Sequence, residues 1–138
     1  MTVDALGPRD IVRTQGSLED AIGNHTVKAR SFGRFESTWH LVEAYLQGDP
    51  EATRVWLDSI WYLAAAIASL VNITDPQRVL VGGGICKDGD ALFKPLVAYL
   101  EELEWRPTGQ AVEIVPAQLG HEAGAIGAAR NAMLGGRA

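Results

Sequence analysis

A short apolar run that ends in three consecutive glycines constrains this chain more than any other feature. Arg78-Val79-Leu80-Val81 has the length and the β-branched content of a buried strand, and Gly82-Gly83-Gly84 follows it directly. Glycine removes every Cβ atom at the carboxyl end of the strand, where open α/β sheets bind their ligands. A flat ring or a phosphate can then touch the backbone and accept from its N–H groups. The alternative is a turn that needs glycine only for positive φ.

Two familiar phosphate-binding motifs do not explain these glycines. A Walker A loop is excluded, because no Gly-Lys-Ser or Gly-Lys-Thr follows Gly84. The dinucleotide fingerprint is excluded too, because its third glycine is missing. The ligand at this strand end, if one binds, must be recognised in another way.

Helical patterns surround the strand. Asp49-Pro50-Glu51 is the strongest helix start, with an N-cap residue, a proline at the first position and an acidic first turn. Apolar residues continue at helical spacing to Val71, which predicts a buried core helix that Asp75-Pro76 ends. Further elements are expected at 90–103 (helix), 112–115 (strand) and 123–134 (helix). This strand-helix-strand-helix order predicts an α/β fold with helices packed on a small parallel sheet, from which strands are missing.

The amino-terminal part reads as helices and loops. Residues 1–15 have no strong period and are expected to be a loosely ordered segment. A helical pattern starts at Ser17, which can cap it, and continues until Gly33 interrupts it. A second helix is expected from Ser37 to Leu46. The main domain is therefore expected at 16–134, followed by a frayed tail at 135–138.

Composition limits the partners and the compartment. The net charge of −5 disfavours a nucleic-acid partner, and the one positive cluster, Lys28, Arg30 and Arg34, reads as a solvated face. The longest apolar stretch, 60–71, is shorter than the roughly 20 residues of a membrane span, so no membrane partner is expected. Cys86 is the single cysteine and the amino terminus has no apolar signal region. Both features favour a cytoplasmic protein.

A second glycine-rich segment makes the pattern specific. Gly120-His121-Glu122-Ala123-Gly124-Ala125-Ile126-Gly127 places small residues around a helix start, which alone suggests close helix packing. Together, "DPQRVLVGGGI" and "QLGHEAGAIGAARNA" resemble the carboxy-terminal signature of ROK-family sugar kinases. "GDPEATRVWLDSIWYLAAAIASLVNI" resembles the long helix that precedes the strand in that family. The resemblance covers about residues 15–133.

The resemblance implies a fold and a chemistry. The fold is part of an actin-like, ribonuclease-H-like ATPase domain, and the chemistry is transfer of a phosphoryl group from ATP, with magnesium, to a hexose or related sugar. Gly82, Gly83 and Gly84 then contact the nucleotide. Gly16-Ser17-Leu18-Glu19 resembles the family's Gly-Cys-x-Glu, which makes Glu19 the sugar-binding candidate. The alternative is that Glu19 simply favours the first turn of a helix through the helix dipole.

Departures from the family pattern limit this expectation. The phosphate-binding Asp-x-Gly-Gly-Thr and the Gly-Asn-Asp with the general base have no counterpart, so no catalytic residue is assigned and the chain is expected to be incomplete for catalysis alone. Ser17 stands where the last zinc cysteine would be, so no metal site is expected. Asn24-His25-Thr26 resembles a substrate motif but follows Glu19, in the wrong order. A complementary amino-terminal half or a homo-oligomer is the expected partner. A non-catalytic sugar-sensing module remains the alternative, and the donor, ATP or polyphosphate, stays open.

Overall fold

The computed structural model describes residues 1–107 and 109–135 and is built around one long helix, α4 (Pro50–Thr74). The Asp49 side chain accepts from the Ala52 backbone N–H at 2.9 Å and caps the helix. Asp75 ends it in the left-handed conformation, with φ of 44°. By length and composition α4 could cross a membrane, but it contacts α1, α3 and α5, as the core helix of a globular domain does.

The second core helix, α5 (Asp90–Leu103), contains a proline in its interior. Pro95 has no N–H, so the carbonyl of Ala91 lacks its normal partner four residues later. The indole N–H of Trp56, on α4, donates to that carbonyl at 2.9 Å. Trp56 is 1% exposed and Ala91 is 8% exposed, so water cannot readily replace this bond. One side chain of α4 therefore completes the backbone bonding of α5.

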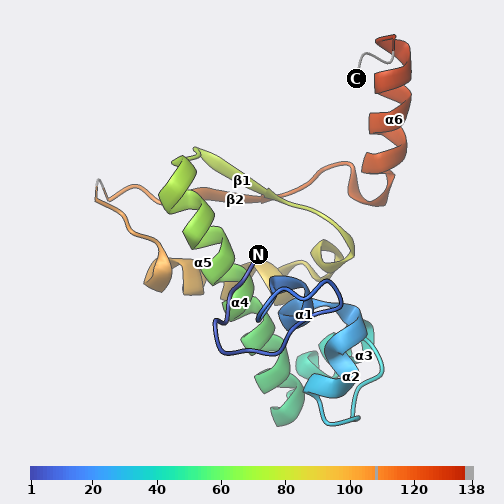
Figure 1. Cartoon of the computed structure of the whole chain (residues 1–138), viewed down its shortest axis with the longest axis vertical. Helices are drawn as coiled ribbons and strands as arrows, with labels where there is room; N and C mark the ends of the chain where they lie inside the picture. Colours follow the sequence, from blue (N-terminus) through green and yellow to red (C-terminus); the bar gives the residue numbers. More distant parts are fainter. Residues whose placement is uncertain (108, 136–138) are drawn as a thin grey trace.

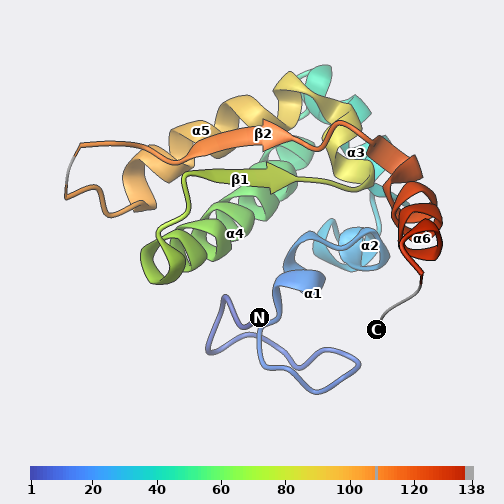
Figure 2. The same ribbon diagram turned by 90° about the horizontal axis from the view of Figure 1, so that it is seen from above.

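Two parallel strands, β1 (Arg78–Val81) and β2 (Glu113–Pro116), form the sheet. Val79 and Ile114 are opposite each other in the register and pack against the core. The strands lie alongside α4 and α5 (Figures 1 and 2). This confirms the predicted α/β class and the strand-helix-strand-helix order, although β2 begins one residue later than expected.

Short helices occupy the amino-terminal part: α1 (Leu18–Ile22), the 3₁₀ turn η1 (Asn24–Thr26), α2 (Val27–Arg30) and α3 (Thr38–Leu46). Ser17 caps α1 as predicted, but the expectation of one helical segment up to Gly33 is wrong. Gly23 is extended, with φ of −66° and ψ of 143°, and its N–H bonds to the Glu19 carbonyl. An added Cβ there would lie 2.4 Å from that oxygen, so glycine is required at this break.

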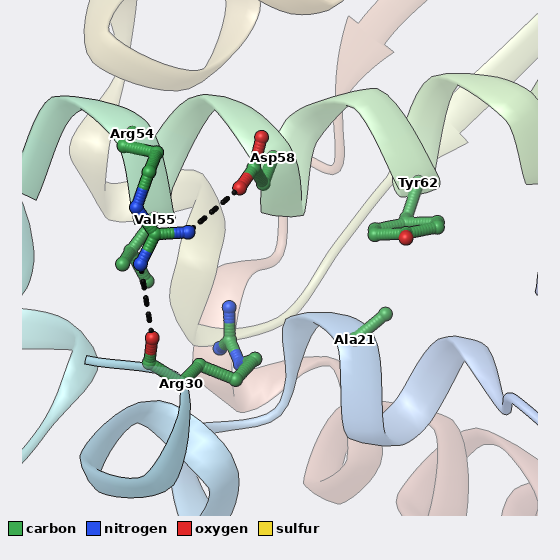
Figure 3. A pocket seen from close by; sticks show the side chains of 6 residues that line it. All are labelled: Ala21, Arg30, Arg54, Val55, Asp58 and Tyr62. Atoms are coloured by element: carbon green, nitrogen blue, oxygen red, sulfur yellow. Dashed lines mark hydrogen bonds and ion pairs between the residues drawn. The ribbon is translucent and has the colours of Figure 1, made fainter. Parts of the chain in front are cut away.

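The expectation that the positive cluster forms a solvated face is wrong for Arg30. The Lys28 and Arg34 side chains are 60% and 51% exposed, but the Arg30 guanidinium points inward (Figure 3). It donates to Ser59 Oγ on α4 at 2.6 Å, to Thr26 Oγ1 at 3.1 Å and to the Gly23 carbonyl at 3.3 Å. Arg30 thus ties the end of α1, α2 and α4 together.

The two ends of the chain differ in how they are held. Residues 1–16 fold back on themselves and on α1 through backbone bonds, including Leu18 N–H to the Met1 carbonyl at 2.9 Å. At the other end, α6 (Ala123–Met133) follows the turn η3 (Gly120–Glu122) and projects away from the body (Figure 1). None of its residues is buried. Residues 136–138 of the predicted frayed tail lie outside the described residues.

We expect Trp56→Phe to lower the free energy of unfolding by about 2 kcal/mol, because the buried Ala91 carbonyl loses its donor. Adding Pro95→Ala supplies a backbone N–H to that carbonyl and should recover part of the loss. Urea unfolding of the single and double variants measures this. Trp39→Phe, at a tryptophan that is 65% exposed, is the control and should change stability little. Equal losses in the single and double variants would contradict the role given to Pro95.

We expect Asp49 to contribute to the acid sensitivity of the fold. The Ala52 N–H and then the Arg34 guanidinium hold the pKa of Asp49 below its usual range, although partial desolvation acts in the opposite direction. A depressed folded-state pKa means that this stabilisation is present above about pH 4 and is lost as the pH falls further. Asp49→Asn keeps a capping oxygen but removes the titration. Its melting temperature should therefore fall less steeply below pH 4 than that of the wild type, with exposed Glu101→Gln as the control.

Candidate functional site

The three glycines predicted to contact a nucleotide lie exposed at the carboxyl end of β1. Gly83 has a φ of 92°, which a side chain would strain, so part of the glycine requirement is conformational. At Gly84, which starts the 3₁₀ turn η2 (Gly84–Asp88), an added Cβ would meet nothing within 4 Å. The strand end therefore presents bare backbone to open space, as a site for a ring or a phosphate requires.

The second glycine-rich segment comes close to the first. The Ala117 N–H, just after β2, donates to the Val81 carbonyl at 2.8 Å, and an added Cβ on Gly82 would lie 3.4 Å from the Ala117 Cβ. Beyond them, η2 and η3 contact each other. Because the strands are parallel, both segments leave the sheet at the same end, the carboxyl end of the strands. The structure thus brings together the two motifs that the sequence singled out.

Glu19, the predicted sugar-binding residue, lies elsewhere. It is an exposed residue in the first turn of α1, whose main contacts are with α4 and η1. The main contacts of η2 are instead with α5 and η3. Glu19 and the glycine loop are therefore built on different elements. Both the sugar-binding role and the helix-dipole explanation of Glu19 remain compatible with its position.

A small pocket of about 160 Å³ lies beside α1 (Figure 3). No sequence pattern predicted it. Arg54 bridges its rim, because it donates to the Asp58 carboxylate at 3.2 Å and to the Arg30 carbonyl at 3.2 Å. Burial lowers the pKa of the Arg30 guanidinium, and the nearby Asp58 carboxylate partly opposes this. Ala21 lines the pocket, and residues two apart on a helix do not share a face, so Glu19 points elsewhere. These arginines already have partners, and we assign the pocket a structural role.

One sequence feature could have indicated that Arg30 points inward, namely its spacing from Val27. It stands three residues after Val27, which is fully buried, so both side chains lie on the same face of α2. Ser59, its partner on α4, lies 29 residues further along the chain. No local pattern connects positions that far apart, and the sequence analysis therefore missed the pair.

The Asn24-His25-Thr26 segment makes structural bonds. Asn24 Oδ1 accepts from the Thr38 backbone N–H at 2.8 Å, and His25 Nε2 lies 3.0 Å from Asp20 Oδ1. The Thr26 hydroxyl donates to the Asp20 carbonyl at 2.6 Å. Within residues 1–107 and 109–135, no group of three His, Cys, Asp or Glu side chains is arranged to hold a metal ion.

Known sequences resemble most of this chain. The ROK family model matches residues 14–133. A glucokinase of Halalkalibacterium halodurans is 39% identical over 67 residues, which cover 49% of this chain and 20% of that protein. The bifunctional enzyme NanE/NanK of Brucella melitensis is 40% identical over 127 residues, 89% of this chain and 23% of that protein. The matched stretches thus cover less than a third of the length of these relatives.

Solved structures match the fold. A ROK glucokinase from Streptomyces griseus, determined in complex with glucose and AMPPNP, superposes with a TM-score of 0.81 at 24% identity, over 98% of this chain and 50% of that one. A ROK hexokinase from Thermus thermophilus superposes with a TM-score of 0.76 at 30% identity, over 97% of this chain and 46% of that one. These 138 residues belong to the ROK family and carry about half of a glucokinase-like fold.

Proposed function

We propose that this chain is the carboxy-terminal, nucleotide-side half of an ATP-dependent hexose kinase. The observation that carries the proposal is the convergence of the two glycine-rich segments at the carboxyl end of the parallel strands. Ligands of α/β sheets bind at this end. The Streptomyces griseus relative was solved with an ATP analogue and glucose, which supports this pair of ligands for a protein of the same fold.

The residues of this chain are suited to binding a nucleotide but not to catalysing phosphoryl transfer from it. Bare backbone at Gly82, Gly83 and Gly84 lets a ring or phosphate approach closely, and N–H groups there can donate to it. Magnesium-bound ATP would supply the phosphoryl group. Transfer also requires charge neutralisation at the phosphates and a base at the attacking hydroxyl, and this sequence lacks both family motifs for them. Those groups must come from the other half of the kinase fold.

The sugar substrate belongs to a class rather than to one compound. Relatives of this chain are named as glucokinases and as the bifunctional NanE/NanK, so their printed names do not agree on one sugar. We propose a hexose or a related sugar, bound between this half and the complementary one. Glu19 would accept hydrogen bonds from its hydroxyl groups.

The first test is a thermal-shift titration of the purified chain with Mg-ATP, with and without glucose, beside a coupled kinase assay. We expect ATP to raise the melting temperature without turnover, because the chain binds the nucleotide but lacks the base. Gly84→Ala adds a Cβ to open space without positive φ, so it should leave the unliganded melting temperature unchanged and reduce the ATP-induced shift by at least half. Ser69→Ala, at an exposed position of α4 outside both glycine-rich segments, is the control.

Other results of this titration would change the proposal. A shift with glucose but not with nucleotide would favour the sugar-sensing module instead. A larger shift with polyphosphate than with ATP would change the donor. Turnover by the chain alone would show that its own residues supply the missing chemistry.

We expect Glu19→Ala to weaken sugar binding at least tenfold in a complex with a complementary half, because hydroxyl hydrogen bonds to a carboxylate are lost. Glu19 is exposed, so the folding stability should change little. Glu36→Ala, at another exposed carboxylate, is the control for the loss of charge. Calorimetric titration with glucose measures the affinity. An unchanged affinity would remove Glu19 from the site and leave only its place in the helix.

A further inference from the structure

The helix that carries Glu19 is too short to hold its own position. Helix α1 has five residues, and none of them is buried. Isolated helices shorter than about 12 residues are marginal in water, so α1 depends on the segments that hold its two ends. Arg30 bonds to the Gly23 carbonyl at its end. Its start continues directly from the amino-terminal segment, residues 1–16, which loops beside α1 (Figure 2).

Backbone bonds connect the amino-terminal segment to the first residues of α1. The Leu18 N–H donates to the Met1 carbonyl at 2.9 Å, and the Gly16 N–H donates to the Pro8 carbonyl at 2.7 Å. Gly16 has a φ of 49°, and an added Cβ there would lie 1.7 Å from the Asp4 carbonyl oxygen. Chain segments this close have no room to shift independently. The conformation of residues 1–16 therefore determines where α1 begins.

One buried carboxylate builds the turn of this segment. Asp10 is buried, and its Oδ1 accepts from the Val12 N–H at 3.0 Å and from the Thr14 N–H at 2.7 Å. Between these two donors, Arg13 has a φ of 66°, a conformation that a non-glycine residue keeps only where other bonds hold it. The turn over 10–14 therefore depends on the Asp10 side chain rather than on the preferences of its other residues.

The Ser17 hydroxyl connects this turn to α1. Ser17 is buried, and its Oγ accepts from the Asp20 backbone N–H at 3.2 Å and so caps the helix. Burial alone would raise the pKa of Asp10, but hydrogen bonds from Ser17 and from the Thr14 and Val12 N–H groups lower it below its usual range. Asp10 is thus an acceptor for the hydroxyl that caps α1. A chain of hydrogen bonds therefore runs from the turn to the residue directly after Glu19.

The side chains of this segment are not suited to a metal ion. The family resemblance implies zinc cysteines before α1, but Ser17 stands at the last of these positions, and Cys86, the single cysteine, lies in η2. Zinc takes thiolate, imidazole or carboxylate ligands. Within residues 1–107 and 109–135 no three such side chains come together, and Oδ1 of Asp10 already accepts from two N–H groups. Hydrogen bonds therefore hold this segment where the resemblance would expect a metal.

We propose that Asp10 is a positioning residue for sugar binding, because its carboxylate orders residues 10–17 and thereby fixes the direction of Glu19 at the start of α1. This deepens the proposed function and rests on it. Glu19 touches the sugar in that proposal, whereas Asp10 acts only through the turn and Ser17. Loss of the Asp10 carboxylate should therefore release the start of α1 and leave the core helices α4 and α5 as they are.

Amide hydrogen exchange on the full chain tests this ordering. In Asp10→Ala we expect the amides of Leu18 and Asp20 to exchange about tenfold faster or more, with no change in α4. Asp10→Asn keeps an oxygen that can accept from both N–H groups and should restore slow exchange. Asp10→Glu keeps the charge but moves the carboxylate by one methylene, so it should behave like Asp10→Ala. Asp4→Ala is the matched control, because it removes a similar bond, from the Leu6 N–H, outside this turn.

Sugar affinity in a complex with a complementary half tests the consequence. By calorimetric titration, Asp10→Ala should weaken glucose binding about fivefold or more, and Asp10→Asn should restore it. In a Glu19→Ala background, Asp10→Ala should change the affinity less than about twofold, because Asp10 acts through Glu19. A metal chelator should change neither the affinity nor the exchange, because no metal holds the segment.

Three results would overturn the proposal: faster exchange confined to Val12 and Thr14, equal losses of affinity with and without Glu19, or a chelator-induced loss that zinc reverses. The two readouts separate this proposal from the proposed function. Faster exchange in α1 with a glucose affinity that Glu19→Ala leaves unchanged rejects the sugar-binding role of Glu19 alone. Unchanged exchange in α1 with a Glu19-dependent affinity rejects the ordering by Asp10 alone.

Discussion

The hydrogen bond from the Trp56 indole to the Ala91 carbonyl holds the two core helices in one arrangement. Pro95 makes this bond necessary, because it leaves that carbonyl without a backbone donor inside a buried helix. The bond also fixes how α5 rotates about its axis, since only one face of α5 carries the unpaired carbonyl. Both strands pack on this helix pair, so the orientation of the sheet and of its glycine-bearing edge follows from it.

The same helix holds the amino-terminal elements through a polar contact. Ser59 lies three residues after Trp56 on α4, close to the same face, and receives the Arg30 guanidinium. Burying a guanidinium is costly unless its nitrogens find acceptors, and here Thr26, Ser59 and the Gly23 carbonyl accept one hydrogen bond from each of its three nitrogens. This network fixes the end of α1 and with it the position of Glu19. Helix α4 thus positions both Glu19 and the glycine loop, through the Arg30–Ser59 and the Trp56–Ala91 hydrogen bonds respectively.

Local patterns predicted most of the elements and missed the contacts between them. The capped start at Asp49, the strand before Gly82 and the helix over 90–103 follow from neighbouring residues, and all three are present. The break at Gly23 was missed because the flanking residues keep a helical pattern, while a close carbonyl demands the glycine. The inward turn of Arg30 and the pairing of Trp56 with Ala91 were missed because the partners are 29 and 35 residues apart. At the site, the spacing of sequence motifs identified the two glycine-rich segments, but only the parallel sheet shows that they lie at the same end of the strands.

The chain pairs the polar groups of its interior and leaves open surfaces at the sheet and beyond it. Within the described residues, every buried side-chain nitrogen and oxygen has a partner. The exposed apolar side chain of Leu80, the free edge of β1 and the unpacked α6 all belong to the sheet or follow it. Phosphoryl transfer needs charge neutralisation and a base that this sequence does not carry. A nucleotide on the glycine loop would sit at the same end of the molecule as these open surfaces. We therefore expect one partner both to cover these exposed surfaces and to supply the phosphate-binding groups and the base.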